Sequence, residues 1–425
     1  MSSPITNRLE SVRRDLHRHP EPAWREFYTT SRLVEELREI GVDELAVGPD
    51  AYDPADRMAV PEENSLDQWL ERARERGADD DLLEKMAGGN TGVVAVLDEG
   101  AGPSVGLRVD IDALFIEEST DETHLPEAEG FRSANDESMH ACGHDAHMTW
   151  GLAVLETIKD REFEGTLTVF FQPAEEVSGG GHPMAKSEYC ADLDHLFAVH
   201  VGLDHPTGEV VAGIERPLAM CHVESTFEGT SAHAGKNPNE GDNAMQALGT
   251  AIQNTYAIPR HSDGMTRVNI GRAEGGTASN VIADEVTVLG EARGETTALM
   301  EYMKEELVQT LRTSAAMHGC DSEVEIVSES PRADSDPELI NVVADVARNV
   351  DGVEKVRPTA DFGASEDATF LMKRVQEDGG SATYLIIGTD HPTSHHTPTF
   401  DVDERSLPIG VEVLTESVLS VSENV

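Results

Sequence analysis

The sequence predicts an α/β fold, in which a mainly parallel central sheet is interrupted by a smaller α+β domain. Short apolar runs alternate with helical patterns between residues 93 and 201 and again after residue 329, which is typical of parallel strands joined by helices. From residue 216 to 328 the pattern changes to short strands around two helices. We therefore expect a large domain formed by 1–215 and 329–425, with a small domain at 216–328 between its two parts.

Apolar periodicity and turn residues locate the elements. A capping-box pattern at Asn7 would begin a helix that ends before Pro20, and a second helix would run from Glu26 to Ile40. Residues 43–90 are polar and are predicted to form a helical insertion. Further large-domain strands are predicted at 93–97, 105–109, 167–171, 196–201 and 382–387, with helices at 144–159, near 339–350 and after 404. In the small domain we expect strands at 223–227, 268–270 and 286–289 and helices at 243–257 and 297–317.

Charge excludes several classes of function. The chain has 81 Asp and Glu against 32 Lys and Arg, a formal net charge of −49, so nucleic acid and anionic membranes would be repelled. The acidic residues are spread along the chain and lysines are few, which is typical of proteins that work in concentrated salt; an ordinary acidic protein is the alternative. No apolar run approaches ~20 residues and the start lacks a secretory pattern, so we expect a cytoplasmic protein.

Two motifs indicate a hydrolytic metal site. The run MHACGHDAH places Cys142 and His144 two positions apart at the mouth of a predicted helix, where they can point to the same side and a thiol becomes more acidic. The run QPAEE places Glu175 and Glu176 just after a predicted strand. One carboxylate could bind metal while the other takes a proton from water. The alternatives are a buried cysteine beside a surface histidine and a solvated acidic pair.

Further polar residues lie at or just past the ends of predicted strands. These are Asp110, Asp112 and His200, together with the Glu pair. Since ligands gather at the carboxyl ends of parallel strands, the placement supports a site there. The run TSHHTP adds His395 and His396, and spacing alone does not choose between them.

With these residues assembled, the chain resembles the M20 family of metallo-amidohydrolases, in particular its branch of N-acyl-amino-acid, hippurate and auxin-conjugate amidohydrolases. The matching runs span nearly the whole chain: LHRHPE, RVDIDAL, MHACGHDAH, QPAEE, GTSAHAG, SEDA and HTPTFD. The insertion from Asp56 to Arg74 and the run from Ala364 to Gln376 narrow the resemblance to members that cleave p-aminobenzoyl-glutamate.

The resemblance implies a role for each motif residue. Glu175 would be the general base, and Asp110 and Asp112 would support the ligands. Two divalent ions would be bound, with Cys142 bridging them; manganese is the family's usual metal and zinc the alternative. The implied metal ligands are Cys142, His144, Glu176, His200 and His396.

The small domain is implied to be a dimerisation or lid domain. His233 would reach into the partner's site and stabilise the oxyanion, and Asn280 would contact the substrate's carboxylate. Phe115 and Ala283 replace prolines common in the family and could alter substrate fit. A substrate glutamate would need a positively charged residue to bind its side-chain carboxylate. The sequence does not choose among four arginines of the small domain: Arg260, Arg267, Arg272 and Arg293.

We therefore expect a metal-dependent amidohydrolase that cleaves p-aminobenzoyl-glutamate into p-aminobenzoate and glutamate. The nearest rival is the same chemistry on another N-acyl amino acid, such as hippurate or an indoleacetyl conjugate. A second rival is a non-catalytic partner subunit, although an inert subunit would be expected to have lost ligands or base. The expected partners are a small N-acyl amino acid and either a second copy of the chain or a related subunit.

Overall fold

The computed structural model describes residues 4–391 and 393–423. The chain packs into two compact units. The first comprises the described residues up to Glu215, Ala333–Phe362 and the described residues from Asp367 onward. The second comprises Arg216–Arg332 and the short segment Gly363–Glu366.

An eight-stranded sheet forms the centre of the first unit, in the order β1-β2-β4-β3-β5-β14-β6-β12. Neighbours β4, β3, β5 and β14 are parallel, whereas β2 runs antiparallel to β1 and β4, and β6 runs antiparallel to β14. The predicted α/β class with a mainly parallel sheet is confirmed, with antiparallel pairs toward its margins. The strands are β1 (Glu44–Val47), β2 (Val93–Asp98), β3 (Ser104–Asp110), β4 (Thr166–Gln172), β5 (His195–Val201), β6 (Glu209–Val211), β12 (Lys355–Arg357) and β14 (Ser381–Ile387).

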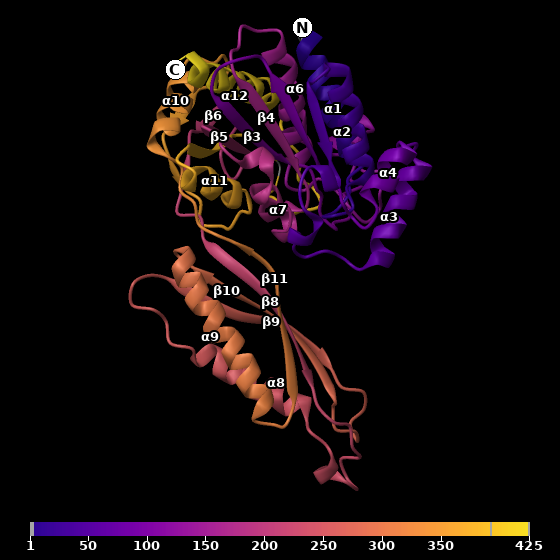
Figure 1. The fold of residues 1–425 in the computed structure, drawn as a ribbon. Helices are drawn as coiled ribbons and strands as arrows, with labels where there is room; N and C mark the ends of the chain where they lie inside the picture. The colour runs from indigo at the N-terminus through magenta and orange to yellow at the C-terminus, as the bar shows by residue number, and fades with distance from the viewer. Residues whose placement is uncertain (1–3, 392, 424–425) are drawn as a thin grey trace. The chain divides into compact units, whose positions relative to one another are not determined.

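Helices cover both faces of this sheet (Figure 1). One layer holds α1 (Pro4–Arg18), α2 (Phe27–Ile40), α6 (His144–Lys159), α10 (Pro337–Ala347) and α12 (Ser406–Glu423), and the other holds α7 (Gly181–Lys186) and α11 (Ala368–Glu377). Helices α3 (Glu63–Glu75) and α4 (Asp80–Met86) pack on α2. The core between these layers is apolar and includes the fully buried rings of Trp24, Trp150, Phe170 and Phe171.

Two local expectations need correction. Helix α1 begins at Pro4 and not at Asn7, because a proline in the first turn can start a helix without losing a backbone hydrogen bond. The insertion at 43–90 contains β1 as well as α3 and α4, since Leu45 and Val47 pair with β2 at the edge of the sheet. Helix α2 ends as expected, with Gly41 in the left-handed conformation at φ 74°.

The second unit is a four-stranded antiparallel sheet in the order β11-β8-β10-β9, covered on one face by two helices. Its elements are β8 (Ala219–Glu228), α8 (Ala244–Ala257), β9 (Thr266–Gly275), β10 (Glu285–Gly294), α9 (Thr297–Ala316) and β11 (Asp321–Ser330). Residues such as Val223, Phe227 and Leu307 form its core. Strand β11 was not predicted because it is an edge strand in which Val324 and Ile326 alternate with Glu323 and Glu325. Among the described helices, none is long and apolar enough to cross a membrane.

Candidate metal centre

The site forms where three neighbouring parallel strands end. Strand β3 ends at Asp110, β4 at Gln172 and β5 at Val201, and they lie side by side in the sheet. The segments that follow them therefore meet at one edge. Helix α6 starts at the same edge, because its first residue, His144, donates from Nδ1 to the main-chain oxygen of Asp112 over 2.9 Å.

Gly143 sets the spacing between Cys142 and His144. Its φ is 85°, in the left-handed region that side chains disfavour. A Cβ atom added there would lie 2.3 Å from the Val201 side chain at the end of β5. Glycine thus lets the 142–144 segment approach β5 closely, and Cys142 Sγ comes to 3.5 Å from His200 Nε2.

The structure brings the implied ligands into overlapping groups. In each group the potential ligand atoms lie within 4.8 Å of one another. Cys142 belongs both to a group with His144 and His200 and to a group with Glu176 and His396, while His144 also groups with Glu175 and Glu176. Two overlapping groups that share a thiol have the arrangement expected for two neighbouring ions.

Unpartnered polar atoms show that the site suits a cation. Among the described residues, His144 Nε2 and Glu176 Oε1 are buried without a hydrogen-bond partner. His144 Nε2 lies 3.8 Å from Glu176 and 4.0 Å from Glu175, too far for hydrogen bonds. Since His144 Nδ1 donates to Asp112, Nε2 is the nitrogen that would offer a lone pair to a metal once the ring has lost its second proton. A thiol, imidazole nitrogens and carboxylates together form a donor set that suits a divalent metal.

The electrostatics of the site also favour bound positive charge. Burial opposes a charge on His144, yet Asp110, Asp112 and Glu176 outweigh it and raise the pKa of His144 to about 10. Burial raises the pKa of Glu176 to about 8, with Asp112 and Asp110 adding repulsion. In the absence of a metal ion, bound protons offset the negative charge of the carboxylates at this edge. A bound metal ion would offset the same charge.

Asp110 lies beside the site but belongs to neither of the two groups of potential ligands that share Cys142. Its carboxylate accepts hydrogen bonds from His147 Nδ1 and, over 2.8 Å, from Arg108. His147 Nε2 accepts the N–H of Val201 over 2.8 Å, so both of its ring nitrogens are engaged. His147 therefore acts as a structural neighbour of His200, although it lies in the same sequence motif as Cys142 and His144.

The two adjacent histidines of the TSHHTP run have different surroundings. His396 Nε2 lies 3.5 Å from Glu176 Oε2, and its backbone takes a left-handed φ of 61°. His395 Nε2 lies 3.2 Å from the carbonyl of Val201, and its ring packs against Phe400. The structure thus groups His396, and not His395, with the other implied ligands.

The small-unit residues lie on two neighbouring loops. His233 bridges to Val281, and the N–H of Ala234 donates to the carbonyl of Asn280 over 3.0 Å. Both His233 and Asn280 are exposed. The four candidate arginines are already engaged: Arg260 and Arg267 with main-chain oxygens, Arg272 with Glu274 and Arg293 with Glu291.

Sequence reasoning missed a buried charge network beside the site. Arg13 Nε donates to Asp145 Oδ2 over 2.7 Å, and His17 lies between Asp145 and Glu118. All four side chains are buried. The available signal was the pair Arg13 and His17, four residues apart on the face of α1 that also carries Leu9 and Leu16.

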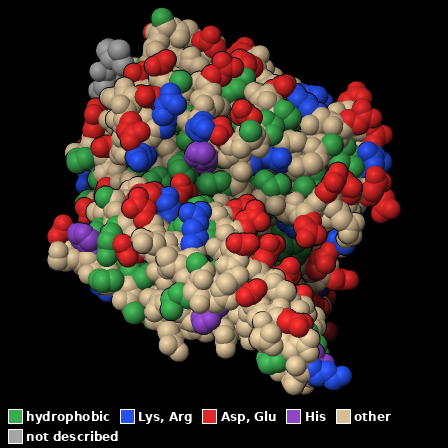
Figure 2. Space-filling view, turned by 60° about the horizontal axis from the view of Figure 1, so that its bottom comes forward, with side chains coloured by type: hydrophobic (Ala, Val, Ile, Leu, Met, Phe, Trp, Pro, Cys, Tyr) green, Lys and Arg blue, Asp and Glu red, His purple; other side chains and the backbone are tan. Residues whose placement is uncertain are grey.

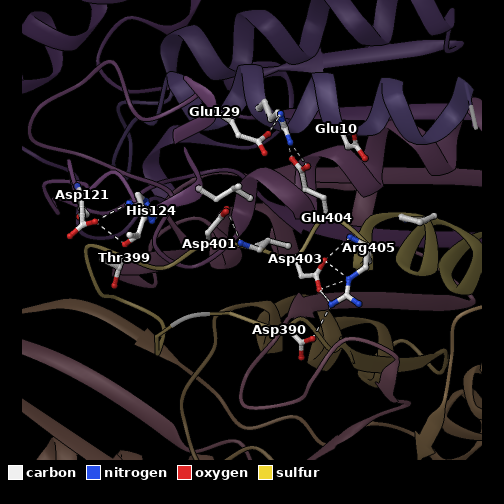
Figure 3. Close-up of a pocket in the computed structure, with 16 residues that line it drawn as sticks. Glu10, Asp121, His124, Glu129, Asp390, Thr399, Asp401, Asp403, Glu404 and Arg405 are labelled. Atoms are coloured by element: carbon white, nitrogen blue, oxygen red, sulfur yellow. Dashed lines mark hydrogen bonds and ion pairs between the residues drawn. The ribbon is translucent and has the colours of Figure 1, made fainter. Parts of the chain in front are cut away.

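A pocket of about 950 Å³ borders this network (Figure 3). Most of its charged lining is acidic, but Asp401 and Glu404 pair with arginines of α1, and Asp403 pairs with Arg405. None of the predicted site residues lines it. The pocket is therefore explained by ion pairing on the surface of the first unit and is distinct from the metal centre.

Comparison with known proteins places these features in a wider group. The model of peptidase family M20/M25/M40 matches residues 106–420. Indole-3-acetyl-aspartic acid hydrolase of Enterobacter agglomerans is 39% identical over 96% of this chain and 94% of its own length. One of the subunits of p-aminobenzoyl-glutamate hydrolase from Escherichia coli strain K12 is 37% identical over 98% of this chain and 96% of its own length. The crystal structure of an aminobenzoyl-glutamate utilization protein from Klebsiella pneumoniae superposes with a TM-score of 0.83 at 32% identity, covering 97% of this chain and 95% of that one.

Proposed function

Because this chain belongs to peptidase family M20/M25/M40, we propose that it is a metal-dependent amidohydrolase whose main substrate is p-aminobenzoyl-glutamate. The observation that carries the proposal is the pair of unpartnered atoms, His144 Nε2 and Glu176 Oε1, buried beside Glu175 at the strand ends. This arrangement offers ligands for a cation and a neighbouring carboxylate that can move a proton.

The residues that would hold two divalent ions are Cys142, His144, Glu176, His200 and His396. Cys142 would be shared by the two ions, because it belongs to the group with His144 and His200 and also to the group with Glu176 and His396. When bound, such ions lower the pKa of a water molecule and polarise the amide carbonyl. We propose manganese, with zinc as the alternative.

Glu175 would act as the base and then as the acid. Its side chain is 12% exposed, so it borders the buried ligands while remaining open to the substrate. It would take a proton from the attacking water and deliver it to the leaving nitrogen of the amide. His233 of a second subunit would donate to the developing oxyanion, and Asn280 would contact the substrate carboxylate.

The acyl group of the substrate has two candidates. Phe115, which is 55% exposed, lies three residues after Asp112 and holds Arg25 over its ring beside Trp69. Such an aromatic surface suits an aminobenzoyl group and also an indoleacetyl group. The second candidate function is therefore hydrolysis of indoleacetyl-aspartate, which the 39% identical relative favours.

An assay of the purified chain alone separates these functions. The chain is incubated with MnCl₂ in molar KCl and given p-aminobenzoyl-glutamate, indoleacetyl-aspartate and hippurate. We expect kcat/KM on p-aminobenzoyl-glutamate to exceed that on the others by at least about tenfold, as expected when a site is built for one acyl group. A higher value on indoleacetyl-aspartate would transfer the assignment to that substrate. If turnover appears only after a related subunit is added, the same assay with Glu175→Gln in this chain decides its role: lost turnover places the catalytic site here, and unchanged turnover makes the chain the non-catalytic partner.

The remaining parts of the proposal concern assembly and environment. The first unit would be the catalytic domain, and the second would pair with another copy or with a related subunit. The pairing with a related chain is proposed because two relatives are named as one subunit of p-aminobenzoyl-glutamate hydrolase or as its homolog. Asp and Glu side chains are scattered over the face in Figure 2, with Lys and Arg interspersed. We propose that the protein works in the cytoplasm of a cell rich in salt.

A further inference from the structure

The segment that carries Glu175 and Glu176 has a strained backbone. Ala174 precedes the pair with φ 56° and ψ 38°, a left-handed conformation that alanine rarely adopts. The turn is closed by the N–H of Gly179, which donates to the Ala174 carbonyl over 2.8 Å. Such a conformation persists only where surrounding groups hold it.

Glu26 is the group that holds Ala174. Its Oε1 accepts the Ala174 N–H over 2.8 Å, and its Oε2 accepts the hydroxyl of Thr91 over 2.6 Å. All three residues are fully buried. Both carboxylate oxygens of Glu26 therefore have defined partners, one of them in the turn.

Glu26 reaches the turn because another residue caps its helix. It stands at the N-cap of α2, yet its side chain makes no capping hydrogen bond. Glu21 instead accepts the N–H groups of Tyr28 over 3.1 Å and Thr29 over 2.8 Å. The two buried carboxylates thus have different partners. Glu21 caps α2, which leaves the Glu26 side chain available to bind the N–H of Ala174.

A second carboxylate holds the other side of the pair. Asp112 Oδ2 accepts the N–H of Glu176 over 3.0 Å. The N–H groups of residues 174 and 176 are thus each held by a carboxylate, with Glu175 between them. We propose that Glu26 is a positioning residue for Glu175 and Glu176. The inference rests on the roles proposed above for these two carboxylates.

Variants of Glu26 test this with Glu21 as a matched control. Glu26→Gln keeps an oxygen for Ala174, and the Thr91 hydroxyl can turn to accept from the amide. Glu26→Ala leaves the Ala174 N–H buried and unpaired. Glu21→Ala removes an equally buried carboxylate that touches α2 and not the turn. The readouts are kcat and KM on p-aminobenzoyl-glutamate, Mn²⁺ affinity by calorimetry, and the melting temperature.

In Glu26→Ala we expect kcat to fall about a hundredfold with KM changed less than about threefold, since small misplacements of a catalytic group carry costs of that size. Mn²⁺ affinity should weaken about tenfold, because Glu176 shares the turn. Glu26→Gln should stay within about fivefold of the wild type in both. Glu21→Ala should melt earlier yet keep kcat and Mn²⁺ affinity.

Equal kcat and Mn²⁺ affinity in Glu26→Ala and Glu21→Ala would overturn the inference, as would a Glu26→Gln variant as impaired as Glu26→Ala. If Glu26→Ala does not fold, Glu26→Asp takes its place, because it keeps the carboxylate but is one methylene too short to reach Ala174. Should the wild type hydrolyse none of the substrates, the proposed function fails, whereas the Mn²⁺ comparison still decides the role of Glu26.

Discussion

His17 Nδ1 lies 2.9 Å from Asp145 Oδ2 in the interior of the first unit. Its other ring nitrogen lies 2.9 Å from Glu118 Oε1. With a carboxylate at each nitrogen, both nitrogens carry protons, and the ring is an imidazolium. Asp145 follows the implied ligand His144 and also accepts from Arg13, which reaches Asp401 in the segment after His396. The network therefore joins two segments that carry implied ligands.

The charge on His17 predicts that stability falls at alkaline pH. Burial opposes the charge, but Glu118 and Asp145 outweigh it and raise the pKa of His17 from 6.5 to about 9. Because the pKa of His17 is higher in the folded state, its charge adds to the free energy of unfolding. This contribution is complete below pH 6.5 and is lost as the pH rises through about 9. In urea unfolding at fixed KCl, His17 should contribute a loss on the order of 3 kcal/mol between pH 6 and pH 9.5.

Two histidine variants check the source of this loss. His17→Gln should reduce the decline between pH 6 and pH 9.5 by the part that His17 contributes, while His144, whose pKa is also raised, adds a part of its own. His19→Gln is the control, because burial lowers the pKa of His19, so its titration makes stability rise and not fall as the pH increases through 6.5. A decline of unchanged size in His17→Gln would show that other groups are responsible.

At the acidic end, Glu118 contributes to stability in the opposite pH range. Burial would raise the pKa of Glu118, but His17 and His124 outweigh it and lower that pKa to about 2, so its contribution is lost only as the pH falls from 4.5 toward 2.

A second prediction separates the roles of the adjacent carboxylates. Glu175→Gln should lower kcat by about 10²- to 10⁴-fold, the usual contribution of a general acid–base, while keeping the metal content. Glu176→Gln should lose metal, because Glu176 Oε1 is the buried unpartnered oxygen. Metal analysis of both proteins after gel filtration gives the comparison. Full turnover in Glu175→Gln would remove that residue from the mechanism, and equal metal content in both variants would remove Glu176 from the ligand set.

The part of the site that the sequence predicts is the part set by local rules. Helix α6 runs from His144 to Lys159 as expected, and Glu175 and His200 lie at strand ends as expected. The choice between His395 and His396 depends on how the loop folds back onto Val201, which spacing does not encode. The metal-ligand assignment itself stays a prediction.

Long-range pairing accounts for what was missed. Strand β11 gains its order from pairing with β8, although its own residues are mostly polar. Glu26 and His17 are ordinary charged residues of helical segments until the fold buries them against Ala174 and Asp145. In a chain with 81 acidic residues, a buried functional carboxylate is hard to distinguish from a surface one before the fold is known.

A third prediction concerns salt. With a net charge of −49, self-repulsion should destabilise the folded chain at low ionic strength. The Debye length falls from about 10 Å at 0.1 M to about 3 Å at 1 M, so the unfolding free energy should rise steeply up to about 1 M KCl and flatten above it. Urea titrations at several KCl concentrations measure this, and the rise should shrink near pH 4.5, where carboxylates begin to neutralise. Equal stability at 0.1 M and 2 M KCl would contradict adaptation to salt.

The last prediction tests whether His233 acts across a subunit interface. His233→Ala and Glu175→Gln should each be nearly inactive alone. If His233 serves the partner's site, a hybrid dimer has one complete site, in which Glu175 of the His233→Ala chain meets His233 of the Glu175→Gln chain. After subunit exchange, an equal mixture should recover roughly a quarter of the wild-type activity, because about half of the dimers are hybrids with one working site of two. An equal mixture of wild type and His233→Ala should keep half of the wild-type activity with or without exchange, so native mass spectrometry has to show that hybrids form. No recovery, despite hybrids detected by native mass spectrometry, would place His233 in its own subunit's site or outside catalysis.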